Sequence, residues 1–222
     1  MSSLLNLPIL FLGDSDITHW SALPSNSLTH ATSGFTSIDV LNSLSLLSSP
    51  CSSKDNGNDS KEVEEVTHCV MVCGENDLSS SIEISYIHSV VSTIKDTIAS
   101  LPSTLPMLRH LLFLGPKLEP WQSNDLSSIL SYLNLHNQLS YSLPKLEIDN
   151  LQITYIDNFS KFTTSSKLTY DLGMFLRSLK EGEELEFEIE RKWFKEDCLH
   201  LSEEGYGVWE GIVREWYIDT MK

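Results

Sequence analysis

Short apolar runs alternate along the chain with longer segments in which apolar residues recur every three or four positions. Five of the short runs predict β-strands: Ile9–Leu12, Leu28–Ala31, His68–Cys73, Leu111–Leu114 and Ile153–Ile156. Four longer segments predict amphipathic helices: Thr36–Leu47, Ile82–Ser100, Leu126–Leu143 and Gly205–Tyr217. Short strands that are almost wholly apolar are typical of parallel sheets covered by helices on both faces. The pattern therefore predicts a doubly wound α/β sandwich with right-handed connections.

Two segments depart from this alternation. Residues 48–65, SSPCSSKDNGNDSKEVEE, are polar throughout and predict a mobile surface loop. Residues 181–194, EGEELEFEIERKWF, form an acidic extension in which apolar residues alternate with glutamates. That period of two predicts a half-exposed strand or hairpin arm. We interpret it as a sheet edge protected by charge rather than as a lid. With no internal repeat, we expect a single domain over residues 1–222.

The charge balance narrows the possible partners. The chain has 15 Lys and Arg against 31 Asp and Glu, a formal net charge of −16. Such a surface repels phosphate backbones and anionic lipids, so we expect neither nucleic acid nor a charged membrane as a partner. No apolar run approaches the roughly 18 residues that cross a bilayer. The first apolar run lacks a basic flank and a cleavage site, so we expect no membrane span and a cytoplasmic protein.

The cysteines and histidines do not indicate a metal or a disulfide framework. The four cysteines have no zinc-knuckle or disulfide-scaffold spacing, and Cys69 and Cys73 share one face of a predicted strand. We expect reduced, mostly buried thiols. The histidines other than His200 also lack metal-ligand spacing, and we interpret His19 and His30 as structural residues near the site.

Polar residues follow the first three predicted strands. Ser15 comes after the first, Gly34 after the second and Asn76 after the third. In an open parallel sheet, ligands bind at the carboxyl ends of the strands, near the point where strand order reverses. The sequence therefore predicts that a hydroxyl, a backbone N–H and a side-chain amide lie at the same edge.

A carboxylate and an imidazole near the C-terminus complete the parts of an acyl-transfer site. Asp197 and His200 are three residues apart, so both side chains can face the same way. A serine is a poor nucleophile until a base takes its proton. His200 can be that base for Ser15, while Asp197 fixes its tautomer. Backbone and amide donors from Ser15, Gly34 and Asn76 can then bind the negative oxygen of the tetrahedral intermediate.

The stretches FLGDSDITHW, ATSGFTS, GEND and DCLHLSEEGYGVW resemble, in order, the four sequence blocks of the SGNH (GDSL-type) hydrolases, a family of esterases and lipases. FLGPKLEP resembles a segment between the third and last blocks. The resemblance implies a three-layer, flavodoxin-like α/β/α sandwich with a five-stranded parallel sheet. It also implies ester hydrolysis without metal or cofactor. By position, Ser15, Asp197 and His200 become the catalytic residues, and Ser15, Gly34 and Asn76 the oxyanion hole.

Two positions depart from the family pattern. Asp16 replaces an apolar residue and can either oppose the developing oxyanion or turn outward to cap the following helix. Glu75 stands where a small residue or threonine is usual, and we expect it to point away from the site.

We therefore expect a serine esterase that cleaves acetyl or short-chain acyl esters of small molecules through an acyl-Ser15 intermediate. Two alternatives stay open. One is a non-catalytic protein of the same fold that binds a ligand or a partner. The other is an acyltransferase with the same triad.

Overall fold

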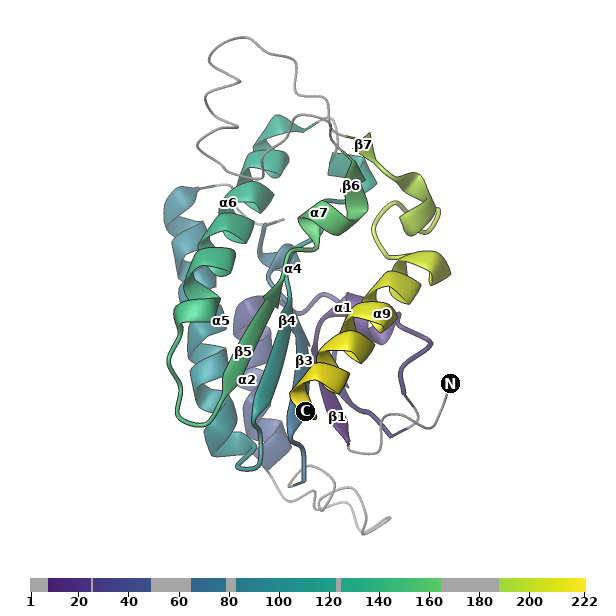
Figure 1. Cartoon of the computed structure of the whole chain (residues 1–222). Coiled ribbons are helices and arrows are strands. Elements are labelled where there is room, and N and C mark those ends of the chain that lie inside the picture. Colours follow the sequence, from purple (N-terminus) through teal and green to yellow (C-terminus); the bar gives the residue numbers. More distant parts are fainter. Residues whose placement is uncertain (1–7, 25, 49–64, 79–82, 123–124, 165–187) are drawn as a thin grey trace.

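Each predicted apolar run forms a strand in the computed structural model, and the five strands join one parallel sheet (Figure 1). The strands are β1 (Ile9–Gly13), β2 (Leu28–Ala31), β3 (His68–Val72), β4 (His110–Leu114) and β5 (Gln152–Ile156). Their order across the sheet is β2-β1-β3-β4-β5. The structure describes residues 8–24, 26–48, 65–78, 83–122, 125–164 and 188–222.

Helices cover both faces of this sheet. The four long helices are those that the sequence predicts: α2 (Ser37–Ser48), α5 (Ile84–Thr104), α6 (Leu126–Ser142) and α9 (Glu203–Thr220). Helices α2, α5 and α6 pack side by side on one face, and α9 lies on the other (Figure 1). The predicted flavodoxin-like sandwich is therefore confirmed.

Short helical turns complete the chain between these elements. They are α1 (Ser15–Thr18), α4 (Glu75–Leu78), α7 (Phe159–Phe162), η1 (Pro120–Gln122), η2 (Leu143–Lys145) and η3 (Arg191–Trp193). Of these, α1 begins immediately after Asp14 at the carboxyl end of β1, and α4 begins three residues after the end of β3.

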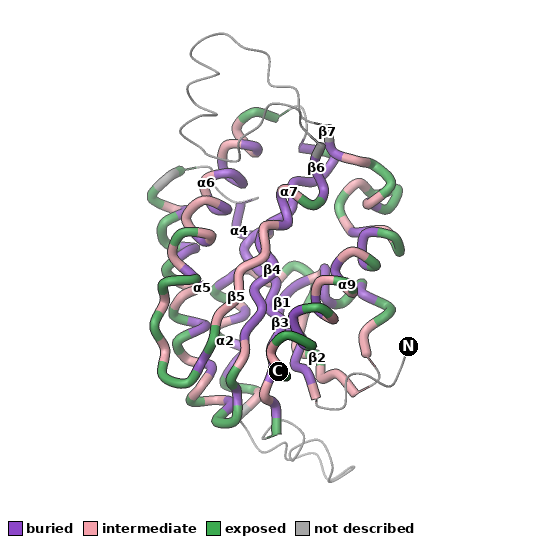
Figure 2. The backbone as a smooth tube through the Cα atoms, in the orientation of Figure 1, coloured by how far each residue is buried: buried purple, intermediate pink, exposed green. Residues whose placement is uncertain are grey.

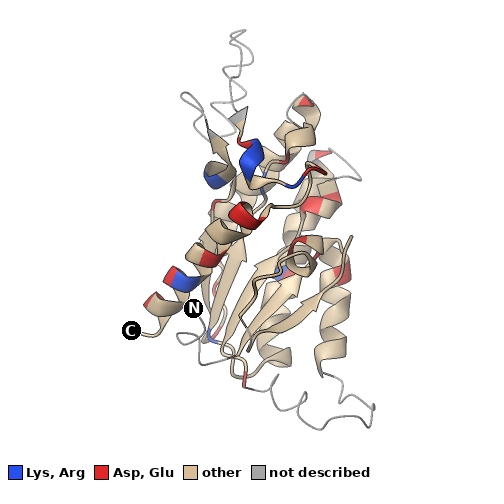
Figure 3. Cartoon of the chain, turned by 90° about the vertical axis from the view of Figure 1, so that its right-hand side faces the viewer, with Lys and Arg blue, Asp and Glu red and all other residues tan. Residues whose placement is uncertain are grey.

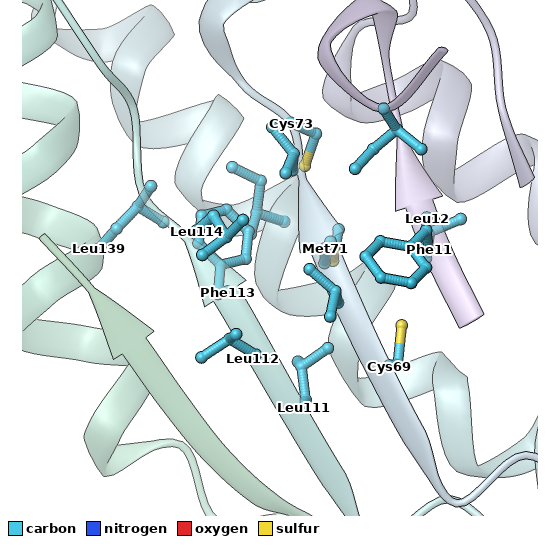
Figure 4. Close-up of a cluster of buried hydrophobic side chains, with 14 of the residues drawn as sticks. Phe11, Leu12, Cys69, Met71, Cys73, Leu111, Leu112, Phe113, Leu114 and Leu139 are labelled. Carbon is cyan, nitrogen blue, oxygen red and sulfur yellow. The ribbon is translucent and has the colours of Figure 1, made fainter. Parts of the chain in front are cut away.

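The hydrophobic core is centred on the sheet. Every residue of β1 and β3 is buried, whereas β5 at the edge is partly exposed (Figure 2). Side chains from the neighbouring strands β1, β3 and β4 gather in one cluster that includes Phe11, Met71 and Phe113 (Figure 4). Burying a side chain of this size stabilises the fold by about 1.5–3 kcal/mol. The apolar runs therefore form strands because both of their faces are removed from water.

Strand order reverses between β1 and β3, so the loops after these two strands diverge to opposite sides of the sheet. Gly13 pairs with Val72 at the carboxyl end of this strand pair. A Cβ atom at position 13 would overlap the Val72 carbonyl oxygen, so only glycine allows this close approach. The sheet therefore presents the segment that starts at Asp14 directly at its topological switch point.

The two irregular segments are described in part. Residues 49–64 and 181–187 lie outside the described residues, so the loop prediction for 48–65 stays a prediction. The end of the acidic extension forms β7 (Glu188–Ile189), which pairs antiparallel with β6 (Thr163–Thr164). In the described part of the extension, the predicted strand is therefore present only at Glu188–Ile189, and Arg191–Trp193 form the helical turn η3 instead.

The remaining composition-based expectations concern the surface and the cysteines. Acidic residues lie on several helices and loops, α9 included (Figure 3). Cys69 and Cys73 are buried free thiols, as predicted, and burial raises the pKa of both. Among the described helices, none is both long and apolar enough to span a bilayer.

Candidate active site

Ser15 is held at the start of α1 by the residue that precedes it. The Asp14 side chain caps the turn, because its Oδ1 accepts a hydrogen bond from the Asp16 amide at 3.1 Å. Thr18 Oγ1 donates to the Ser15 carbonyl oxygen at 2.9 Å. The Asp14 carboxyl is buried, and burial together with the neighbouring Asp16 raises its pKa to about 8. The half-buried Ser15 thus lies on a short turn that is fixed from both sides.

Asp197 and His200 form the pair that the sequence predicts. His200 Nδ1 lies 2.8 Å from Asp197 Oδ2, while Asp197 Oδ1 accepts from the amides of Leu199 and His200 at 2.9 and 3.0 Å. Burial alone would raise the pKa of Asp197, but these hydrogen bonds outweigh it and lower the pKa to about 2. Cys198, with a φ of 59°, supplies the left-handed residue that curls this loop. Asp197 is therefore an ionised acceptor that orients the imidazole.

The loop of Asp197 and His200 lies against the turn that begins with Ser15. The His200 ring is 4.0 Å from the ring of His19, measured between centroids. His19 in turn donates its backbone N–H to the Ser15 carbonyl oxygen at 2.9 Å. Tyr206, on α9 just after His200, donates its hydroxyl to the Asp16 carbonyl oxygen at 2.9 Å. The structure thus brings the beginning and the end of the chain together at this turn.

His19 lies near the site, where the sequence analysis places it, and its ring is a direct neighbour of His200. The residue is exposed. Burial, followed by the charge of His200, lowers the pKa of His19. His19 is therefore held toward its neutral form beside the imidazole.

Gly34, in the loop before α2, and Asn76, in α4, lie on segments that are bonded to each other. Gly34 is exposed, has a φ of +82°, and a Cβ atom there would meet no other atom within 4 Å. Asn76 Nδ2 donates to the carbonyl oxygen of Phe35 at 2.9 Å. Asp77 binds the Ser37 amide and hydroxyl at 2.7 and 2.8 Å. The side-chain amide of Asn76 is therefore fixed next to Gly34.

The sequence reasoning missed a buried cluster beside this site. Lys117 is 1% exposed, and its Nζ lies 2.8 Å from Asp16 Oδ2, 2.7 Å from Glu75 Oε2 and 3.2 Å from Glu119 Oε1. We call Lys117, Asp16, Glu75 and Glu119 the Lys117 cluster. Asp16 does not turn outward, and Asp14 provides the cap that was considered for it. The sequence did contain a signal for this cluster, because Asp16, Glu75 and Lys117 each follow a predicted strand within a few residues.

Charges in the Lys117 cluster depend on one another. Burial would lower the pKa of Lys117, but the surrounding carboxylates raise it well above its ordinary value. Burial raises the pKa of Glu75 and of Glu119, against the opposing effect of Lys117. The lysine is therefore a cation that compensates buried negative charge.

Comparison with known proteins supports the fold of this chain. No protein-family model and no curated protein sequence matches it. Among solved structures, a GDSL-like lipase from Bacteroides thetaiotaomicron VPI-5482 superposes with a TM-score of 0.58 and 12% identity. That match covers 96% of this chain and 88% of the other.

Two further solved structures cover nearly the whole of both chains. One is a member of the lipolytic protein G-D-S-L family from Veillonella parvula DSM 2008, with a TM-score of 0.53 and 13% identity. The other is a lipase from a goat rumen metagenome, with a TM-score of 0.54 and 13% identity. Both matches cover 90% of this chain and 92% of the other. The architecture of this chain is therefore the SGNH (GDSL-type) hydrolase fold.

Proposed function

We propose that this protein is a serine esterase that hydrolyses carboxylic esters, with acetyl and short-chain acyl esters of small molecules as its substrates. One observation carries the proposal. The hydrogen-bonded pair of Asp197 and His200 packs, through His19, against the turn that begins with Ser15. A hydroxyl, an imidazole and an oriented carboxylate at one sheet edge are the parts that nucleophilic acyl transfer requires.

In the proposed mechanism, His200 acts as the general base. Its Nδ1 is bonded to Asp197, so Nε2 carries the lone pair that accepts the proton of the Ser15 hydroxyl. The Ser15 oxygen attacks the ester carbonyl carbon, and the proton on His200 then passes to the departing alkoxide. This gives an acyl-Ser15 ester and an alcohol. Water repeats the sequence on the acyl-enzyme, which releases the carboxylic acid and restores Ser15.

The proposed oxyanion donors are the backbone N–H groups of Ser15 and Gly34 and the side-chain amide of Asn76. Loss of one such donor raises the barrier by about 3–4 kcal/mol. The open space beside Gly34 supports this role, because a carbonyl oxygen can approach its backbone without meeting a side chain. The hydrogen bond from Asn76 to Phe35 supports it as well, since it fixes the plane of the amide in advance.

A fluorophosphonate probe tests the nucleophile. We expect the wild-type protein to be labelled at Ser15, and Ser15→Ala to abolish the labelling. His200→Ala should slow it strongly. Matched controls are Ser89→Ala and His88→Ala, because both residues are exposed on α5. These two variants should label at the wild-type rate.

Turnover of p-nitrophenyl acetate, butyrate and longer esters then tests the reaction. We expect the rate to be highest with the shortest esters and to disappear in Ser15→Ala. A folded wild-type protein that neither labels nor turns over any of these esters would contradict the proposal and favour a binding protein. Transfer of the acyl group to an added alcohol in preference to water would identify an acyltransferase instead.

A further inference from the structure

The Lys117 cluster joins the three loops that follow β1, β3 and β4. Asp16 comes from α1, Glu75 from the start of α4, and Lys117 and Glu119 from the segment between β4 and η1. Glu75 is held twice, because its other carboxylate oxygen accepts the backbone N–H of Lys117. One side chain therefore fixes the spacing between the first residues of α1 and those of α4.

The members of the cluster are direct chain neighbours of the proposed catalytic groups. Asp16 follows Ser15, and Glu75 precedes Asn76. Asn76 is bonded to the carbonyl of Phe35, which follows Gly34. The contacts thus form a continuous path from Ser15 through Lys117 to Asn76 and Gly34. All three proposed oxyanion donors lie on this path.

The cluster also has a charge role. Asp16 is 3% exposed, and a carboxylate so close to Ser15 would oppose negative charge on the substrate oxygen. The Lys117 ammonium lies 2.8 Å from Asp16 Oδ2, whereas Oδ1 of the same carboxylate is buried without a hydrogen-bond partner in the described part of the chain. Lys117 is therefore the group that offsets this charge.

We propose that Lys117 is a positioning residue for the oxyanion hole: it fixes the Ser15 turn against the Asn76 turn and cancels the negative charge of Asp16 beside them. This role rests on the proposed esterase function. Lys117 does not touch the substrate, and it acts through Asp16 and Glu75. Its removal should therefore lower the rate of the chemical step and leave substrate binding almost unchanged.

Lys117→Met tests this role, because it keeps the length of the side chain and removes the charge. With p-nitrophenyl acetate we expect kcat to fall roughly 10- to 100-fold while KM changes by less than about threefold. Lys145→Met, at an exposed position after α6, is the matched control and should keep the wild-type kcat.

A pH profile separates charge compensation from simple packing. Without its cation, the cluster gains uncompensated negative charge as pH rises, so Lys117→Met should lose further activity on the alkaline side. Asp16→Asn in the Lys117→Met background should restore part of kcat, because it removes the carboxylate next to Ser15. Other ionisable groups face the cluster and are unchanged in these variants: Asp14, His19, Cys73, Tyr132 and Tyr206. A wild-type kcat in Lys117→Met, or no recovery in the double variant, would overturn the proposal.

Hydrogen exchange distinguishes this proposal from the esterase proposal. Peptides that cover residues 13–20 and 74–78 should lose protection in Lys117→Met, while those of α5 should not. If the wild-type protein is inactive, the esterase function fails and the exchange result alone decides whether Lys117 joins the two turns. If Lys117→Met does not fold, the Asp16→Asn/Lys117→Met variant, which loses one charge of each sign, is compared with Asp16→Asn. Equal protection in the two variants would then contradict the link.

Discussion

At the scale of single residues, two glycines beside the site should respond differently to alanine. Gly13→Ala places a Cβ atom against the Val72 carbonyl oxygen and must separate β1 from β3. We expect a loss in the free energy of unfolding of the order of 3 kcal/mol or more. In Gly34→Ala the new Cβ atom meets no neighbouring atom, so only the left-handed φ lowers the free energy of unfolding, by about 1–2 kcal/mol. Urea unfolding curves of both variants check this order.

Gly34→Ala should nevertheless impair turnover. Its Cβ enters the open space through which we expect the substrate to reach the backbone N–H. At a temperature where the variant is fully folded, we expect kcat/KM for p-nitrophenyl acetate to fall at least about tenfold. A rate equal to that of wild type would remove Gly34 from the proposed oxyanion hole.

Asp197→Asn probes the orientation of the imidazole. Asparagine has the same shape but can donate a hydrogen bond to Nδ1, which favours the tautomer with the proton on Nε2. The expected loss in kcat is roughly 10³- to 10⁴-fold. The Asp197 side chain is 45% exposed, so the folded state should persist. Stopped-flow labelling with the probe measures the loss of reactivity, and a circular dichroism spectrum checks that the variant is folded. A loss of reactivity below tenfold would exclude the proposed role of Asp197.

At the scale of elements, α9 and α1 are joined by one buried hydrogen bond. Tyr206→Phe removes the donor that binds the Asp16 carbonyl oxygen and keeps the ring stacked on Trp20. We expect a loss of about 1–2 kcal/mol in the free energy of unfolding. Because the bond also holds the Ser15 turn, kcat should fall roughly tenfold. Tyr141→Phe on the exposed face of α6 serves as the control, and equal kinetics in the two variants would contradict the argument.

Element prediction succeeded where the pattern was long enough to repeat. All five sheet strands and all four long helices were predicted, with bounds that differ by a few residues. The turns α1, α4 and α7 were not predicted, because four residues span about one helical turn and show no period. The turn α1 depends instead on its cap, Asp14, whose effect requires the sheet to be in place.

At the scale of the whole molecule, the meeting of Asp197 and His200 with the Ser15 turn was predictable and the Lys117 cluster was not. Parallel strands place their carboxyl ends at one edge, so polar residues after successive strands must gather there. A lysine after a strand ordinarily extends into solvent. Lys117 is buried because Asp16, 101 positions away, and Glu75, 42 positions away, converge on it. Such a convergence of opposite charges depends on strand order, which no local pattern encodes.

The opposite end of the sheet carries a histidine that should make the stability of the molecule depend on pH. His68 at the start of β3 stacks on His110, and its ring nitrogens are bonded to Thr67 and to Thr220 at the end of α9. Burial, followed by the charge of His110, lowers the pKa of His68 to about 4 from its ordinary 6.5. As pH falls through 6.5, His68 binds a proton in the unfolded chain but not in the folded protein, where its pKa is lower. This contribution to stability is therefore complete above pH 6.5 and is lost between pH 6.5 and about 4.

The same pH range contains an opposing effect, so one curve does not isolate His68. Asp14, whose pKa is raised to about 8 from 3.8, binds a proton in the folded state first and adds stability as pH falls. The measurement is therefore the difference in unfolding free energy between wild type and His68→Gln, whose amide side chain does not titrate. Each pKa unit is equivalent to about 1.4 kcal/mol, so the wild-type advantage should shrink by more than about 1 kcal/mol from pH 7.5 to 4.5. Parallel curves for the two proteins would show that His68 titrates equally in the folded and unfolded states.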